Sequence, residues 1–198
     1  PYWGLYLQDQ GFDALAIGQL MAILMGTKVV APYLWGWLGD ALGRRMPIIR
    51  WASAVSVLTF VGIFWVDGFW GVALVMALFS FFWNASLPQM EVVTFSYLGA
   101  QSQRYARIRL WGSIGFVVAA IALGFLVEGQ GIGVVPPVLL AIYLGIWLAS
   151  LPIREPQAGA VAQGEHSIAA VLRRPAIIAF FAAIFLMQVA HGPYYTFY

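Results

Sequence analysis

The sequence predicts an all-α integral membrane protein, and three observations support that class: composition, the length of the apolar runs and the placement of charge. Hydrophobic residues make up 62% of the 198 positions and charged residues 9%, whereas an ordinary soluble domain has about 25% charged residues. A soluble fold of this size has too little interior to bury so much apolar surface, so lipid must solvate much of it.

The polar residues that remain exclude several other classes of function. The sequence has no cysteine, and its two histidines, His166 and His191, stand in no metal-ligand spacing. We therefore expect no disulfide, no metal and no cofactor. No nucleophile–base pattern indicates an enzyme, and no basic stripe interleaved with aromatic residues indicates nucleic-acid binding.

Apolar runs near the ~20 residues that cross a bilayer as helix divide the chain into predicted spans. Short polar turns separate these runs, apart from one long polar stretch between residues 152 and 175. The predicted spans are residues 1–7 (the end of a first span), 15–38, 48–66, 69–98, 107–127, 134–151 and a partial span from 176. Both ends of the chain fall inside apolar runs, so we expect a piece of a longer, twelve-span protein.

Arginines mark one side of the predicted membrane domain. They flank the turns after the second and fourth spans and lie in the long polar stretch, whereas the alternate turns carry only acids: Asp9, Asp13, Asp67 and Glu128. Basic residues concentrate on the cytoplasmic side of membrane proteins. The arginine-bearing face is therefore predicted to be cytoplasmic, and the protein to be a multi-pass component of the inner, or plasma, membrane.

Six spans, a polar linker and the start of another span suggest a duplicated six-helix unit. We expect an N-terminal transmembrane bundle over residues 1–152, a cytoplasmic linker over 153–175 and the start of a C-terminal bundle over 176–198. The hexamer Pro1–Tyr6 is echoed by Pro193–Tyr198 at the corresponding point of the first and seventh spans. Related halves of this kind are found in transporters.

Glu91 is the acid placed deepest in apolar sequence, and Arg109 opens the next predicted span. The two lie symmetrically about Ala100 in the turn, so each is ~13 Å from the apex of an antiparallel hairpin. They can meet at one depth, and because ions in a membrane are costly unless paired, a salt bridge is predicted. The pair either binds solute or only braces two helices.

Two other titratable residues lie inside predicted spans, and each has two interpretations. Lys28 is mid-span and either contacts an anionic solute or is buried against carbonyls or a water cavity. His191 either exchanges protons, since histidine titrates near physiological pH, or forms a hydrogen bond between helices.

The second predicted span closes with Gly-Trp-Leu-Gly-Asp-Ala-Leu-Gly-Arg-Arg at residues 36–45. The glycines permit close helix approach and a tight turn, and Asp40 can pair with an arginine or cap a helix. The run resembles the cytoplasmic signature loop of the major facilitator superfamily, with Ala41 where that family usually has a basic residue. The resemblance implies a conformational role for Gly36, Gly39, Asp40, Gly43, Arg44 and Arg45.

A second stretch narrows the resemblance. Asn84, Pro88 and Glu91, followed by Arg-Ile-Arg-Leu-Trp-Gly-Ser-Ile-Gly-Phe at residues 107–116, are similar to the oligosaccharide–proton symporter family that includes lactose permease. In that family the matching Glu and Arg contact substrate, which implies this role for Glu91 and Arg109, with Asn84 and Phe116 on the same wall. Phe116 stands where lactose permease has a tryptophan that stacks on sugar. Residues 109–113 and 188–195 are more similar to the phenylpropionate-permease branch than to lactose permease.

The resemblance implies a function. It is proton-coupled symport of a small organic solute, an aromatic acid such as a phenylpropionate or a sugar, by alternating access. The partners would be solute, protons and lipid, with the full-length protein monomeric. Two alternatives stay open: an exporter or antiporter of the same superfamily, which the Glu91–Arg109 pair argues against, and a membrane sensor or scaffold that transports nothing.

Overall fold

The computed structural model describes residues 2–155, 175, 177–180, 182–183 and 185–186. These fall into two compact units, residues 1–158 and 159–198. His191 and the repeated hexamer at residues 193–198 lie outside the described residues, and so does most of the predicted linker. The predicted division at residue 152 therefore stays a prediction.

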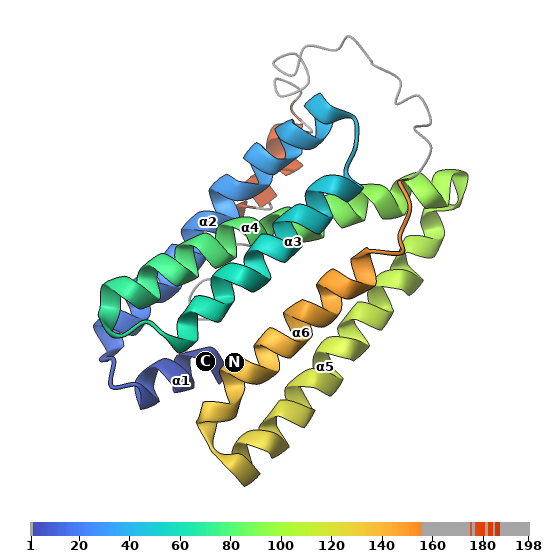
Figure 1. The fold of residues 1–198 in the computed structure, drawn as a ribbon. Helices are drawn as coiled ribbons and strands as arrows, with labels where there is room; N and C mark the ends of the chain where they lie inside the picture. The colour runs from blue at the N-terminus through green and yellow to red at the C-terminus, as the bar shows by residue number, and fades with distance from the viewer. Residues whose placement is uncertain (1, 156–174, 176, 181, 184, 187–198) are drawn as a thin grey trace. The chain divides into compact units, whose positions relative to one another are not determined.

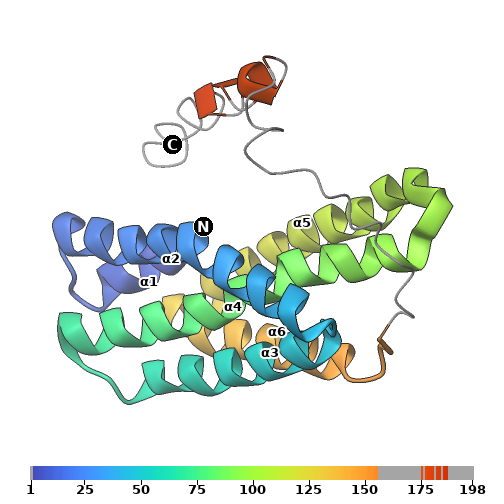
Figure 2. The same ribbon diagram turned by 90° about the horizontal axis from the view of Figure 1, so that it is seen from above.

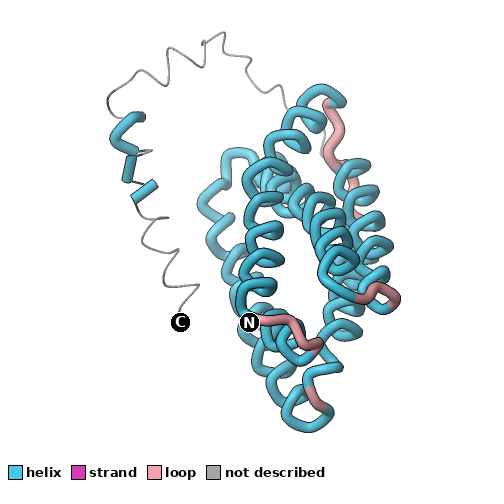
Figure 3. The backbone as a smooth tube through the Cα atoms, turned by 90° about the vertical axis from the view of Figure 1, so that its left-hand side faces the viewer, coloured by secondary structure: helices cyan, strands magenta, loops and turns pink. Residues whose placement is uncertain are grey.

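Every regular element in the described part of the first unit is a helix, which confirms the all-α class. In chain order the helices are α1 (Tyr2–Asp9), α2 (Ala14–Leu42), α3 (Met46–Val61), α4 (Gly68–Leu98), α5 (Tyr105–Gln130) and α6 (Val135–Ser150). Three short 3₁₀ segments follow α3, α4 and α5: Gly62–Phe64, Gly99–Arg104 and Ile132–Val134. Loops are correspondingly short and lie at the helix ends (Figure 3).

Helix α4 lies between α2 and α3, as Figures 1 and 2 both show. Thr27 of α2 bonds to Ser80 of α4, and Trp35 of α2 bonds to Gln89 of α4, in the same chain order, so these two helices run parallel. Helix α3 runs antiparallel to α4, because Phe60 meets Phe79 at one end and Ile49 meets Val93 at the other. Helix α6 packs on α3, and α5 runs beside α6 (Figure 1).

Two turn predictions were wrong because the helices continue further than expected. Residues 39–42 are the last turn of α2, which ends only at Gly43, where φ is 61° and the backbone N–H bonds to Gly39 O at 3.0 Å. Likewise α5 runs through Glu128 to Gln130 and ends at Gly131, with φ at 85°. Glycine tolerates these positive φ values. The helices therefore end at the glycines rather than at the first polar residues.

Apolar packing concentrates at two places in the bundle. The larger cluster includes Leu7, Leu20, Phe60 and Met76, and the smaller one, at the other end of α3, comprises Met46, Ile49 and Val93. Large apolar side chains also face outward, with Trp70 82% exposed. Such a surface suits lipid or further protein rather than water.

Four helical stretches within the described residues are long and apolar enough to cross a membrane: Ala14–Leu42, Met46–Phe64, Gly68–Gln130 and Ile132–Ser150. The third contains α4 and α5 joined through the 3₁₀ segment Gly99–Arg104. Two of these helices contain an internal proline and continue through it: Pro32 in α2 and Pro88 in α4. Each proline lacks an N–H, so the carbonyls four residues earlier, on Lys28 and Asn84, lose their helical hydrogen bond.

Candidate functional site

Glu91 of α4 and Arg109 of α5 form an ion pair, as their positions in the sequence predict. Arg109 Nη1 lies 2.7 Å from Glu91 Oε1. The side chains are 65% and 36% exposed respectively, so the pair lies at a surface of the described unit. Only one nitrogen and one oxygen make the contact, whereas arginine–carboxylate pairs are often bidentate.

A third residue, Tyr105, completes this pair into a triad. Its hydroxyl donates to Glu91 Oε1 at 2.8 Å and accepts from Arg109 Nη1 at 2.9 Å. Tyr105 lies one helical turn before Arg109 on α5, and side chains four positions apart share a helix face. Sequence reasoning missed it because a neutral phenol adds no charge to the count; the i, i+4 spacing from Arg109 was the available signal.

A second polar group joins α2 and α4 farther from the α4–α5 turn. Asn84 Nδ2 donates to Thr27 Oγ1 at 3.2 Å, and the hydroxyls of Thr27 and Ser80 lie 2.8 Å apart. Asn84 precedes Glu91 by seven residues, which places both on nearly the same face of α4, ~10 Å apart along the helix. No hydrogen bond to Asn84 Oδ1 comes from the described residues.

The remaining predicted solute-site residues do not join the triad. Lys28 is exposed next to Thr27, with no ion pair among the described residues. Phe116 is 66% exposed and lies seven residues beyond Arg109, on the same face of α5. The described structure thus brings Glu91 and Arg109 together, bonds Asn84 to α2, and leaves Lys28 and Phe116 on open surfaces.

The predicted signature loop forms a separate, tightly connected network at the ends of α2 and α4. Arg45 pairs with Asp40 and also donates to Gln89 Oε1, while Gln89 Nε2 donates to Trp35 O at 2.7 Å. Gly39 packs directly against this network: a Cβ there would lie 2.9 Å from Gln89 Oε1 and 3.1 Å from Arg45 Nη1. Only glycine fits at that position without displacing a bonded partner.

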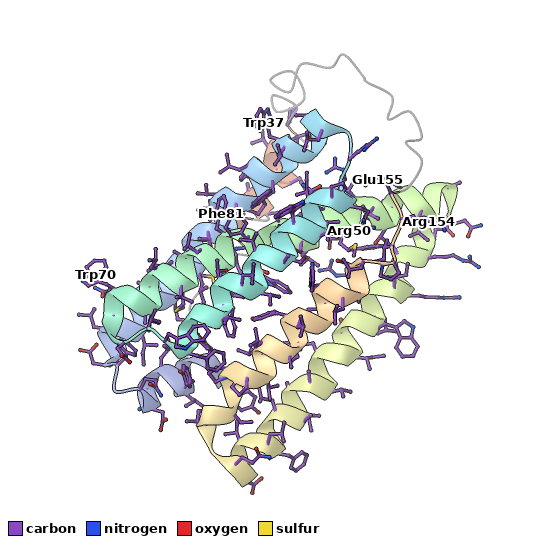
Figure 4. The ribbon with its side chains drawn as sticks, in the orientation of Figure 1. Trp37, Arg50, Trp70, Phe81, Arg154 and Glu155 are labelled. Carbon is purple, nitrogen blue, oxygen red and sulfur yellow. The ribbon has the colours of Figure 1, made fainter. Side chains whose placement is uncertain are left out.

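The segment after α6 is tied to the start of α3 in the same region. The Glu155 carboxylate accepts from the backbone N–H groups of Arg45 and Met46, at 2.8 and 2.7 Å. Arg50 Nη2 donates to Leu151 O and Ile153 O, at 3.0 and 2.7 Å. Arg50, Arg154 and Glu155 accordingly lie together in Figure 4.

These contacts settle one open question about the loop. Asp40 pairs with an arginine and makes no cap in the described structure, whereas Glu155 caps α3. A carboxylate at a helix N-terminus satisfies free N–H groups and opposes the helix dipole. Gln89 and Glu155 were both missed from sequence, because neither stands in a motif and each acts on a segment far away in the chain.

The sequence model of the MFS_1 like family matches residues 1–198, the whole chain. The chain belongs to this family. It is therefore a membrane protein of the major facilitator superfamily of transporters, as the signature loop and the charged hairpin predicted.

Individual relatives in this superfamily agree with that placement. The chain is 28% identical over 208 residues to a protein named "Probable 3-phenylpropionic acid transporter" from Escherichia coli (strain K12), with 100% of the chain and 53% of the relative covered. It is 29% identical over 129 residues to the maltose permease of Geobacillus stearothermophilus, covering 64% of the chain and 32% of that protein. No solved structure matches the chain closely enough to extend the comparison.

The chain spans about half the length, or less, of these two curated relatives. Major facilitator transporters place their substrate between two related halves. The roles of the triad in solute binding and of the signature-loop network in conformational exchange stay predictions.

Proposed function

We propose that the whole protein is a proton-coupled symporter of a small aromatic carboxylic acid, operating in the inner membrane by alternating access. The observation that supports the proposal is that the ion pair occupies only one of the three nitrogens of the Arg109 guanidinium. Arg109 uses Nη1 for both Glu91 and Tyr105, and neither Nη2 nor Nε has a partner among the described residues. Two parallel N–H groups on one edge of a guanidinium fit a carboxylate in a bidentate manner.

Charge balance links the acid to a proton. Glu91 and Arg109 neutralise each other through their ion pair. A solute carboxylate bound to Arg109 brings a second negative charge next to Glu91, and like charges at this distance repel strongly in a low-dielectric environment. A proton on Glu91 removes that repulsion, so acid and proton bind more tightly together than either does alone.

The relatives support an acid more than a sugar. The relative named as a probable 3-phenylpropionic acid transporter matches the full chain, whereas the maltose permease matches 64% of it. A sugar offers hydroxyl groups and no charge, so it would leave the free edge of Arg109 without a carboxylate partner. We therefore place 3-phenylpropionate first among candidate solutes and maltose second.

Other predicted residues receive roles within this proposal. Phe116, on the Arg109 face of α5, would contact the aromatic ring of the solute. Asn84 and Lys28 would line the same cavity nearer its centre, and His191 would contribute from the second half. Asp40 and the rest of the signature loop, on the cytoplasmic side, would bias the exchange between inward-open and outward-open states.

The test is solute-driven proton uptake by the full-length protein in proteoliposomes that carry an internal pH-sensitive dye. We expect 3-phenylpropionate to acidify the lumen, and maltose and 3-phenylpropanamide to leave its pH unchanged. Acidification by maltose and not by 3-phenylpropionate would show that the substrate is a sugar rather than an acid. Proton movement opposite to solute movement would make the protein an antiporter, and binding without any flux would favour a sensor.

A further inference from the structure

The hydroxyl of Tyr105 lies at the centre of the charged site, within hydrogen-bonding distance of both ions. We propose that Tyr105 is a positioning residue that keeps one edge of Arg109 free and thereby sets a preference for carboxylates over neutral solutes. This role rests on the proposed function for its substrate, but its structural basis can be tested without any substrate.

A count of donors and acceptors shows what the hydroxyl does. Arg109 Nη1 donates to Glu91 Oε1 at 2.7 Å and to the Tyr105 oxygen at 2.9 Å. The Tyr105 proton goes to the same Glu91 oxygen, at 2.8 Å. These three atoms therefore form a closed triangle, which uses Nη1 and the phenol proton and leaves Nη2 and Nε outside it.

This triangle favours a contact in which Glu91 bonds to a single nitrogen of Arg109. Glu91 gains its second hydrogen bond from Tyr105 rather than from a second nitrogen of Arg109. Without the hydroxyl, Glu91 would obtain that second bond by turning both of its oxygens onto two nitrogens of Arg109, the fork geometry that such pairs commonly adopt. The nitrogens that the solute carboxylate needs would then be occupied by the protein itself.

Ring packing also holds Tyr105 in place. The Tyr105 ring stacks on Phe95 of α4, with ring centroids 4.4 Å apart and an interplanar angle of 27°. Tyr105→Phe removes the oxygen and keeps this stacking, so it separates the hydroxyl from the packing. Tyr97→Phe is a matched control, because Tyr97 also loses one hydrogen bond, to Arg154 O at 2.7 Å, away from the ion pair.

The first experiment measures affinity in the purified full-length protein. Dissociation constants are determined for 3-phenylpropionate and for its uncharged amide, 3-phenylpropanamide. In Tyr105→Phe we expect acid affinity to fall about tenfold, the size of one charge-assisted hydrogen bond, and amide affinity to stay unchanged. Tyr97→Phe should change neither constant, and Tyr105→Phe should have little effect on acid binding when Glu91 is already Gln, because no carboxylate remains to close onto Arg109.

The second experiment needs no solute. Phenylglyoxal modifies accessible guanidinium groups, and mass spectrometry reads the rate at Arg109 separately from that at the exposed Arg107. Tyr105→Phe should slow modification of Arg109 severalfold and leave Arg107 unchanged, whereas Glu91→Gln should accelerate it. An unchanged Arg109 rate in Tyr105→Phe would overturn the positioning role, and so would equal losses of acid and amide affinity. Failure of the unmodified protein to bind any carboxylate, with the Arg109 rates as expected, would overturn the proposed substrate only.

Discussion

Arg45 and Arg109 each pair with a carboxylate, and their surroundings differ in the number of guanidinium nitrogens that the described residues occupy. Arg45 spreads its bonds over the guanidinium, with Nη1 on Gln89 and Nη2 on Asp40, and its side chain is 22% exposed. Arg109 concentrates its bonds on Nη1, and its side chain is 65% exposed. Arg45 thus donates to the protein from both terminal nitrogens, whereas Arg109 donates from Nη1 alone and keeps Nη2 and Nε free of partners among the described residues.

The two clusters also differ in how many segments they join. The Arg45 cluster connects the end of α2, the start of α3, α4 and the segment after α6. Within the described residues, the triad joins α4 and α5 alone. We therefore expect changes around Arg45 to alter stability and conformational exchange, and changes around Arg109 to alter solute binding.

The largest expected effect is on transport, from neutralising the triad. Glu91→Gln or Arg109→Gln should each reduce 3-phenylpropionate uptake by about two orders of magnitude, as commonly follows the loss of one positioned charged group. The double variant should regain the expression level of the unmodified protein, because no lone charge remains in the membrane. It should not regain uptake, since the contacts to solute are still missing.

Uptake in proteoliposomes and yield after purification measure these two outcomes. Arg107→Gln is the matched control, since Arg107 is exposed on the same helix and has no ion pair among the described residues. If the double variant regained uptake as well as yield, the pair would be a helix brace, and the contrast with Arg45 would disappear.

Asp40→Asn tests the other cluster by removing one charge and little volume. Asp40 pairs with Arg45, whose other side-chain bond goes to Gln89 and not to a member of the triad. We expect turnover to fall about tenfold while the dissociation constant for solute changes less than about twofold, because the substitution biases conformations rather than binding. Stopped-flow uptake and equilibrium binding separate the two; weaker binding with normal turnover would contradict the assignment.

Gly39→Ala should destabilise the protein by about 2 kcal/mol, since overpacking a close contact commonly costs about 1–3 kcal/mol. The new Cβ would lie 2.9 Å from Gln89 Oε1, which is held by Arg45. Gly36→Ala is the control on the same helix, where a Cβ meets nothing within 4 Å in the described structure. Thermal unfolding in detergent should show a clear decrease in the midpoint temperature for Gly39→Ala and none for Gly36→Ala. Equal shifts would show that Gln89 and Arg45 can move aside at no cost in stability.

Glu155→Ala should have the smallest effect, about 1 kcal/mol, which is typical of a lost helix cap. The substitution leaves the N–H groups of Arg45 and Met46 without their carboxylate. Glu128→Ala serves as control, because Glu128 makes no hydrogen bond or ion pair with the described residues. Hydrogen exchange at the first turn of α3 should increase in Glu155→Ala alone, and unchanged exchange there would rule out the cap.

The sequence was sufficient for the features that depend on local pattern. Apolar runs located the helices to within a few residues, and the symmetry of the hairpin about Ala100 predicted that Glu91 and Arg109 meet. A charged residue inside an apolar run can be expected to have a partner of opposite charge, because an unpaired charge in a membrane is very unfavourable. The helix ends at Gly43 and Gly131 were less visible, since polar residues can continue a helix when no residue stops it.

The parts that could not be predicted depend on contacts between distant segments. Glu155 lies more than a hundred positions from the backbone that it caps, and nothing near it in the sequence identifies its partner. Gln89 is an uncharged residue inside α4, and its role follows only from the closeness of Gly39 and Arg45. Tyr105 was overlooked for a different reason: its spacing was visible, but a phenol next to a charged pair is not conspicuous.

The two prolines within helices have a mechanical consequence. Pro32 and Pro88 free the carbonyls of Lys28 and Asn84, and the Thr27–Asn84 hydrogen bond places these two points at one height on parallel helices. Bending α2 and α4 there would break no backbone bond at that position, because proline has already removed it. The Thr27–Asn84 bond thus links the points at which each helix lacks a backbone bond, and the signature loop, Gln89 and Glu91 all follow these points in the chain.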